Sequence, residues 1–139
     1  MPGRGLESKY QGSKWCRRDL RLAIYLRDGL ACSWCGDALE DGARLTLDHL
    51  VPHSQGGSNE ATNLVTACQQ CNSSRGDRSL PRFAKAVLTY LGSDITSRTL
   101  VRRIQTKVSD PIGPYRTEAK QLIARRGNYT EAVASLTGA

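Results

Sequence analysis

The sequence contains no apolar run close to the roughly 18 residues that a membrane-spanning helix needs. Its first sixteen residues also lack the apolar segment of a cleaved signal peptide. Neither a membrane-spanning nor a secreted protein is therefore expected. Large apolar side chains are scarce as well, because the 139 residues include one Phe, one Met and two Trp. A chain of this length is expected to form one domain that buries about two-thirds of its unfolded surface. We therefore expect something besides core packing to stabilise it.

The five cysteines do not fit a disulfide framework, because an odd number leaves one of them unpaired. Four of them form two pairs with two residues between the members, Cys32 with Cys35 and Cys68 with Cys71, and Cys16 is left over. The expected compartment is the cytosol, where disulfides are rare and such pairs typically bind metal. We predict that the four thiolates close a structural zinc site, and that Cys16 is a small buried residue on a helix.

The excess of positive charge is confined to the two ends of the chain. Residues 1–29 carry seven basic and three acidic side chains, residues 30–80 carry three and six, and residues 81–139 carry ten and four. This distribution suits a protein that contacts a polyanion with its flanks and holds a divalent cation in its centre. A solubilising role for each single Lys or Arg is the alternative.

Turn and capping residues divide the chain into a polar arm at 1–13, a core at 14–79 and a basic helical extension at 80–139 packed on the same domain. Ser13 is expected to cap a helix over 14–28 that Gly29 ends. Residues 44–51 alternate and are rich in β-formers, which predicts one strand of a hairpin. A short helix is expected to follow Cys71. Apolar spacing, with a Ser79 cap, predicts helices over 80–91, 95–108, 115–126 and 129–136. The predicted fold class is α+β.

Both histidines lie in one segment that begins with Asp48 and His49 and ends with Pro52 and His53. A Gly-Gly loop, an Asn63-Leu pair and the closing Cys-x-x-Cys-Asn72 follow it. Together these residues resemble the HNH endonuclease family, over about residues 30–77. The resemblance implies a small ββα-metal finger, here tied by a four-cysteine zinc site and flanked by N- and C-terminal helices.

The residue types suit the chemistry that the resemblance implies. Phosphodiester hydrolysis needs a base to deprotonate water, and a neutral imidazole performs this at neutral pH. It also needs positive charge at the phosphate, which a divalent ion supplies. Asp48 and Asn72 carry the hard oxygens that magnesium prefers. Since Asp48 and His49 are neighbours on a strand, their side chains should point to opposite faces unless the strand bulges or ends there.

By resemblance, His49 is the general base, and Asp48 and Asn72 are the metal ligands. Asn63 is the middle residue of the motif, which braces the loop and orients the base; a turn cap is the alternative for it. Gly76 stands where some family members carry a third ligand, a His, and this favours loosely held Mg²⁺ or Mn²⁺.

Three further residues are candidates for phosphate contact: His53, Arg75 and Arg78. The alternative for His53 is loop packing or exposure to solvent, and for either arginine it is a solvated cation at a helix end.

The resemblance implies a metal-dependent endonuclease that hydrolyses DNA to 5′-phosphate and 3′-hydroxyl ends, in a bacterial cell or phage-infected host, as in phages and mobile elements. Two alternatives stay open. One is a non-catalytic zinc-stabilised module that binds nucleic acid, and the other is an RNA- or structure-specific nuclease with the same centre. The joint presence of Asp48, His49 and Asn72 favours an enzyme over a binding module.

Overall fold

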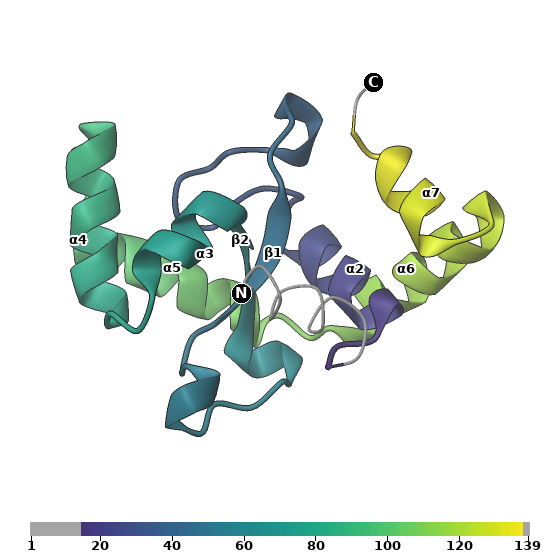
Figure 1. The fold of residues 1–139 in the computed structure, drawn as a ribbon, viewed down its shortest axis with the longest axis horizontal. Helices are drawn as coiled ribbons and strands as arrows, with labels where there is room; N and C mark the ends of the chain where they lie inside the picture. Colours follow the sequence, from purple (N-terminus) through teal and green to yellow (C-terminus); the bar gives the residue numbers. More distant parts are fainter. Residues whose placement is uncertain (1–14, 138–139) are drawn as a thin grey trace.

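The computed structural model describes residues 15–137, so the predicted polar arm and the capping Ser13 lie outside the described residues. Within these residues, one α-helix precedes the two strands and the other α-helices follow them (Figure 1). The helices and strands are α2 (Arg18–Arg27), β1 (Leu45–His49), β2 (Leu64–Cys68), α3 (Gln69–Arg75), α4 (Leu80–Leu91), α5 (Ser97–Ser109), α6 (Gly113–Arg126) and α7 (Tyr129–Ala134). Three 3₁₀ turns join them: η1 (Leu39–Asp41), η2 (His53–Gln55) and η3 (Ala61–Asn63).

The two strands form an antiparallel sheet that leads directly into a helix. Leu45 pairs with Cys68 at one end of the ladder, and His49 pairs with Leu64 at the other. β2 is buried at all five positions, and α3 begins at the next residue. The α+β class predicted from the sequence is confirmed, with a ββα unit at its centre.

Helices cover both faces of this small sheet. In Figure 1, α3, α4 and α5 lie on one side of the strands, and α2, α6 and α7 lie on the other. One core cluster joins Val65 and Ala67 of β2 to Phe83, Leu100 and other apolar residues of α4 and α5. A second cluster joins Leu47 and Leu64 to α2, and Cys16 belongs to it with 3% of its surface exposed. Cys16 is therefore the small buried residue that the sequence predicted.

A buried ion pair ties α2 to the sheet. The side chains of Arg27 and Asp28 have no exposed surface, and Arg27 Nε lies 2.8 Å from Asp28 Oδ1. Arg27 also donates to the carbonyl oxygens of Ala61 and Leu64, while Asp28 accepts from the Thr66 amide. Because both charges are fully bonded, their burial is compensated.

Several predicted boundaries are confirmed by capping interactions. Ser79 accepts a hydrogen bond from the Arg82 amide at the start of α4, and Gly92 ends that helix in a left-handed conformation with φ +66°. Other boundaries differ by a few residues. α2 begins at Arg18, and α3 begins at Gln69 rather than after Cys71, because Cys68 Sγ accepts from the Cys71 amide and caps the helix one turn earlier. β1, α5, α6 and α7 also begin or end one or two residues from the predicted positions. Among the described residues, no helix has the length and apolar character needed to cross a membrane.

Candidate functional site

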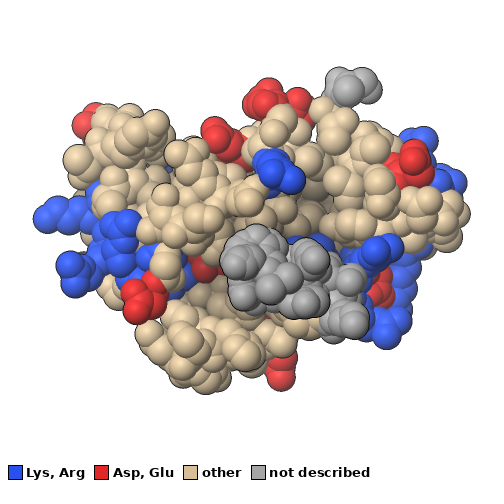
Figure 2. Space-filling model, viewed as in Figure 1, with Lys and Arg blue, Asp and Glu red and all other residues tan. Residues whose placement is uncertain are grey.

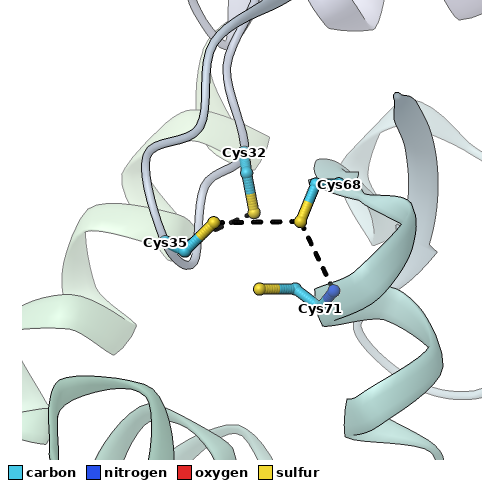
Figure 3. A group of neighbouring side chains, drawn as sticks. All are labelled: Cys32, Cys35, Cys68 and Cys71. Carbon is cyan, nitrogen blue, oxygen red and sulfur yellow. Dashed lines mark hydrogen bonds between the residues drawn. The ribbon is translucent and has the colours of Figure 1, made fainter. Parts of the chain in front are cut away.

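Two knuckles bring the four paired cysteines together (Figure 3). Cys32 and Cys35 lie on the loop after α2, Cys68 ends β2, and Cys71 lies on α3. Their sulfur atoms all lie within 4.8 Å of one another, and Cys35 Sγ is 3.8 Å from Cys68 Sγ. Zn–S bonds of about 2.3 Å in a tetrahedron place sulfurs about 3.8 Å apart. The four cysteines are thus positioned for a structural metal such as zinc.

The pKa values of the cysteines also indicate that the cluster binds a cation. A hydrogen bond from the Cys71 thiol lowers the pKa of Cys32 to about 5, and burial raises the pKa of Cys35 to about 12. Four thiols this close therefore cannot all ionise without a positive charge between them. In each pair the second cysteine's amide donates to the first sulfur, at 3.4 Å in both, which stabilises negative sulfur.

Asp48 and His49 point to opposite faces of β1, as expected for neighbours on a strand. Asp48 lies on the face that meets α3 and is 4% exposed. Its Oδ2 accepts from the Trp34 indole N–H at 2.9 Å, and its Oδ1 accepts from Arg75 Nη1 at 2.6 Å. Burial raises the pKa of the Asp48 carboxyl, although the Arg75 guanidinium and the Trp34 N–H oppose this rise.

Arg75 is the hub of this face and corrects one expectation from the sequence. The residue is 2% exposed, so its guanidinium is not available to a phosphate. Besides Asp48, it donates to the carbonyl oxygens of His49 at 2.9 Å, Leu50 at 2.8 Å and Arg78 at 3.1 Å. The Arg75 side chain therefore joins the end of β1 to the end of α3. To make these bonds its guanidinium must be buried between the two elements.

Asn72 lies one helical turn before Arg75 and also faces β1. Its Nδ2 donates to Thr46 Oγ1 and to the Leu47 carbonyl oxygen, both at 3.0 Å. Within residues 15–137 no donor lies on its Oδ1, so this amide oxygen is open. An ionised carboxylate has about four lone-pair sites, and Asp48 uses two of them. The donor set of Asp48 and Asn72 thus fits a hard divalent ion in kind.

His49 lies at the end of β1, on the face that meets α2. Its Nε2 lies 2.8 Å from Asn59 Oδ1. An amide oxygen only accepts, so this contact places the proton on Nε2 and leaves Nδ1 as the nitrogen with the lone pair. The Trp15 ring packs against the imidazole at 4.8 Å between centroids, and the exposed His53 ring lies 6.0 Å away.

Asn63 holds the loop that follows His49. Its Oδ1 accepts from the Val51 amide at 2.9 Å, and its Nδ2 donates to the carbonyl oxygens of Val51 at 3.1 Å and Ser58 at 2.8 Å. These bonds cross the loop that carries Asn59, so Asn63 fixes the segment that contacts the imidazole. A Cβ at Gly57 would overlap the Val51 carbonyl oxygen, which explains a glycine at this position.

Arg78, the remaining candidate for phosphate contact, is exposed. Its guanidinium lies over the Phe83 ring at 5.3 Å and donates to the Ser74 carbonyl oxygen at 2.7 Å. The structure thus brings Asp48, Asn72 and Arg75 together on one face of β1 and places His49 on the other. Sequence reasoning missed Asn59 and Trp34, since nothing in their local pattern distinguishes them from an ordinary loop residue and a knuckle aromatic.

A comparison with protein families identifies the central segment. Residues 32–78 match the model of the HNH endonuclease family. This segment is similar to the HNH endonuclease domain. The match covers both knuckles, β1, β2 and α3, so it confirms the resemblance seen in the sequence and supports a nuclease-type function.

One curated relative is similar to part of the chain. Over 71 residues the chain is 35% identical to the CRISPR-associated endonuclease Cas9 of Corynebacterium diphtheriae. The matched segment is 50% of this chain, and it spans 6% of the length of that relative. No solved structure matches the chain.

Proposed function

We propose that this protein is a metal-dependent HNH endonuclease that hydrolyses DNA phosphodiester bonds to 5′-phosphate and 3′-hydroxyl ends. The observation that carries the proposal is the placement of His49 in the matched HNH segment, where Asn59 orients its imidazole and Asn63 holds the loop. A general base needs a free lone pair at a fixed position, and these contacts supply both.

In this proposal the residues on the two faces of β1 have different roles. His49 Nδ1 takes a proton from the attacking water, and Asn59 holds the ring through Nε2. Asp48 and Asn72 would hold a Mg²⁺ or Mn²⁺ ion, which supplies positive charge for the phosphate and the leaving oxygen. Arg75 acts as a positioning residue, because it fixes the Asp48 carboxylate and the His49 carbonyl together.

The wider setting is part of the same proposal. We place the nuclease core at 14–79, with 80–139 as an extension, and the four thiolates as ligands of a structural zinc. A cytosolic location fits a site of reduced thiolates, and a phage or mobile element is the expected origin. His53 and Arg78 are exposed and are our candidates for contact with phosphate.

Cleavage of supercoiled plasmid tests the proposal directly. The zinc-loaded protein is incubated with plasmid and Mg²⁺ or Mn²⁺, next to His49→Ala and to His53→Ala, which tests the proposed phosphate contact of the neighbouring imidazole. We expect nicked or linear product from the wild type, and a loss of about a hundredfold or more in rate for His49→Ala. End-labelling of the product then checks for 5′-phosphate. Single-turnover cleavage by His49→Ala at the wild-type rate would contradict the assignment of the base.

A further inference from the structure

We propose that a basic groove between α4 and α5 is the docking surface for the phosphate backbone of duplex DNA, an inference that rests on the proposed function. Lys85 of α4 and Arg98 and Arg102 of α5 provide its charge, and all three are exposed. Pro81, Ser97 and Gln105 are among the other residues that line it.

Two neighbouring hollows form the groove. It consists of two shallow hollows of about 470 and 430 Å³ that share Ser97. Arg98 and Arg102 line the first hollow, and Lys85 lines the second. The hydroxyl of Ser97 and the amide of Gln105 add hydrogen-bond donors between the cations. A row of cations with polar donors is the chemistry that recognises a line of phosphates.

Within residues 15–137, the three cations of the groove have no acidic partner. Residues 78–109 carry seven Lys or Arg side chains and one acidic side chain, Asp94. Lys and Arg side chains gather over the end of the molecule that α4 and α5 occupy (Figure 2). Within the described residues, Lys85, Arg98 and Arg102 form no ion pair.

Arg98 lies at a position in α5 where a positive charge is unfavourable for the helix. It is the second residue of α5, and neither α4 nor α5 has an acidic residue in its first turn. A cation at a helix N-terminus opposes the helix dipole. Arg98 therefore weakens the helix that carries it, and an external anion would offset that effect.

The basic residues of α6, unlike Arg98, have favourable interactions within the protein. Arg116 and Lys120 lie 3.2 and 3.8 Å from the Asp19 carboxylate of α2, so they help to join two helices. Arg125 and Arg126 lie in the last turn of α6, where a cation is favourable for the dipole. The geometry thus singles out α4 and α5 among the basic helices.

The helix that lines the groove also contacts the loop between β1 and β2. α5 packs against η3, which contains Asn63. Val101 lines the first hollow, and both Val101 and Leu50, the residue after His49, pack against the same core cluster. A DNA backbone held in the groove would be anchored on the elements that support the base.

The salt dependence of DNA binding tests this surface with a matched pair of variants. In the His49→Ala background, Arg98→Gln/Arg102→Gln is compared with Arg125→Gln/Arg126→Gln, which removes the same charge from another helix. Anisotropy of a labelled 20-base-pair duplex gives the binding constant at several NaCl concentrations, and circular dichroism checks that each variant is folded. Each lost phosphate contact lowers the absolute slope of log K against log salt by about 0.9.

We expect the α5 double variant to lower that slope by about 1.8, and the α6 double variant to leave it unchanged. Lys85→Gln should lower it by about 0.9. An unchanged slope for the α5 variant, or equal losses for both double variants, would overturn the inference. Binding does not depend on cleavage, so a wild type that binds through the groove but cuts no plasmid would contradict the proposed function alone.

Discussion

Arg75 shows how a single residue organises the HNH domain. Its guanidinium donates to the Asp48 carboxylate and to three backbone carbonyls on two different elements. Both partners of the ion pair are buried, with 2% and 5% of their side-chain surfaces exposed. Such a pair contributes little net stability compared with apolar packing, but the loss of one partner leaves an unpaired buried charge.

Replacement of Arg75 by Ala should therefore lower the free energy of unfolding by about 3–5 kcal/mol. Urea denaturation of the zinc-loaded protein measures it. Arg82→Ala, an exposed arginine on α4, is the control and should change the free energy of unfolding by less than about 0.5 kcal/mol. If both variants unfold at the same urea concentration, the proposed role of Arg75 is wrong.

Asn59 is the second residue whose role depends on one contact, the 2.8 Å hydrogen bond to His49 Nε2. We expect Asn59→Ala to reduce single-turnover cleavage by about tenfold or more with DNA binding retained, because the imidazole is no longer oriented. Asn59→Asp should in addition move the rising limb of the pH–rate profile to higher pH. A carboxylate favours the charged imidazole, so the neutral base forms only at higher pH.

The Ala variant is the control for that pH effect, since it removes the contact without adding charge. A purely structural role for Asn59 would lower the activity of both variants and leave the two pH profiles superimposable.

At the scale of elements, the side chains of the loop between β1 and β2 help to fix its conformation. Asn63 bonds across the loop, and Gly57 donates its amide to the Pro52 carbonyl oxygen at 3.0 Å. A Cβ at Gly57 would overlap the Val51 carbonyl and lie 2.9 Å from Asn63 Nδ2. The loop therefore closes only with glycine at this position.

We expect Gly57→Ala to displace the Asn63 bonds, lower the free energy of unfolding by about 1–3 kcal/mol and reduce cleavage with it. Gly56→Ala is the matched control. Its Cβ meets no atom within 4 Å, so it bears only the cost of a positive φ of +87°. Urea denaturation and single-turnover cleavage measure both variants, and equal losses at the two positions would show that the overlap with Val51 is unimportant.

For the whole molecule, two features are expected to stabilise the fold: the core and a metal such as zinc held by the four-cysteine cluster. The cysteine cluster joins the loop after α2 to β2 and α3, and it packs in the same core cluster as α4 and α5. Zinc bound there contributes folding free energy directly. The ion proposed at Asp48 and Asn72 has two protein ligands, so it stays hydrated and exchanges readily.

The two metals should therefore be separable. Brief chelation should abolish cleavage, leave the circular dichroism spectrum unchanged and be reversed by Mg²⁺ or Mn²⁺. The dialysed protein should retain about one zinc per chain, as a closed four-ligand site implies. Cys35→Ser and Cys71→Ser should lose zinc and melt at lower temperature. Variants that lack zinc yet melt like the wild type would refute the stabilising role of the site.

The sequence by itself determined the features that depend on neighbouring residues. The Ser79 cap, Gly92 and the apolar spacing of 80–91 specify α4, because capping and periodicity act within one element. The spacing of the cysteines indicated a shared metal site, since ligand geometry restricts which pairs of residues bind one ion. The alternation of a strand predicted opposite faces for Asp48 and His49.

Only the tertiary structure decided which distant groups meet these residues. From its position in the sequence, Arg75 is expected to be a solvated cation at a helix end. It is buried instead, because Asp48, 27 residues away, and three carbonyls surround its guanidinium. Asn59 occupies an ordinary polar loop, and it reaches His49 only because Asn63 closes that loop. Burial and hydrogen bonding between distant segments depend on how the elements pack, and no local pattern in the chain encodes them.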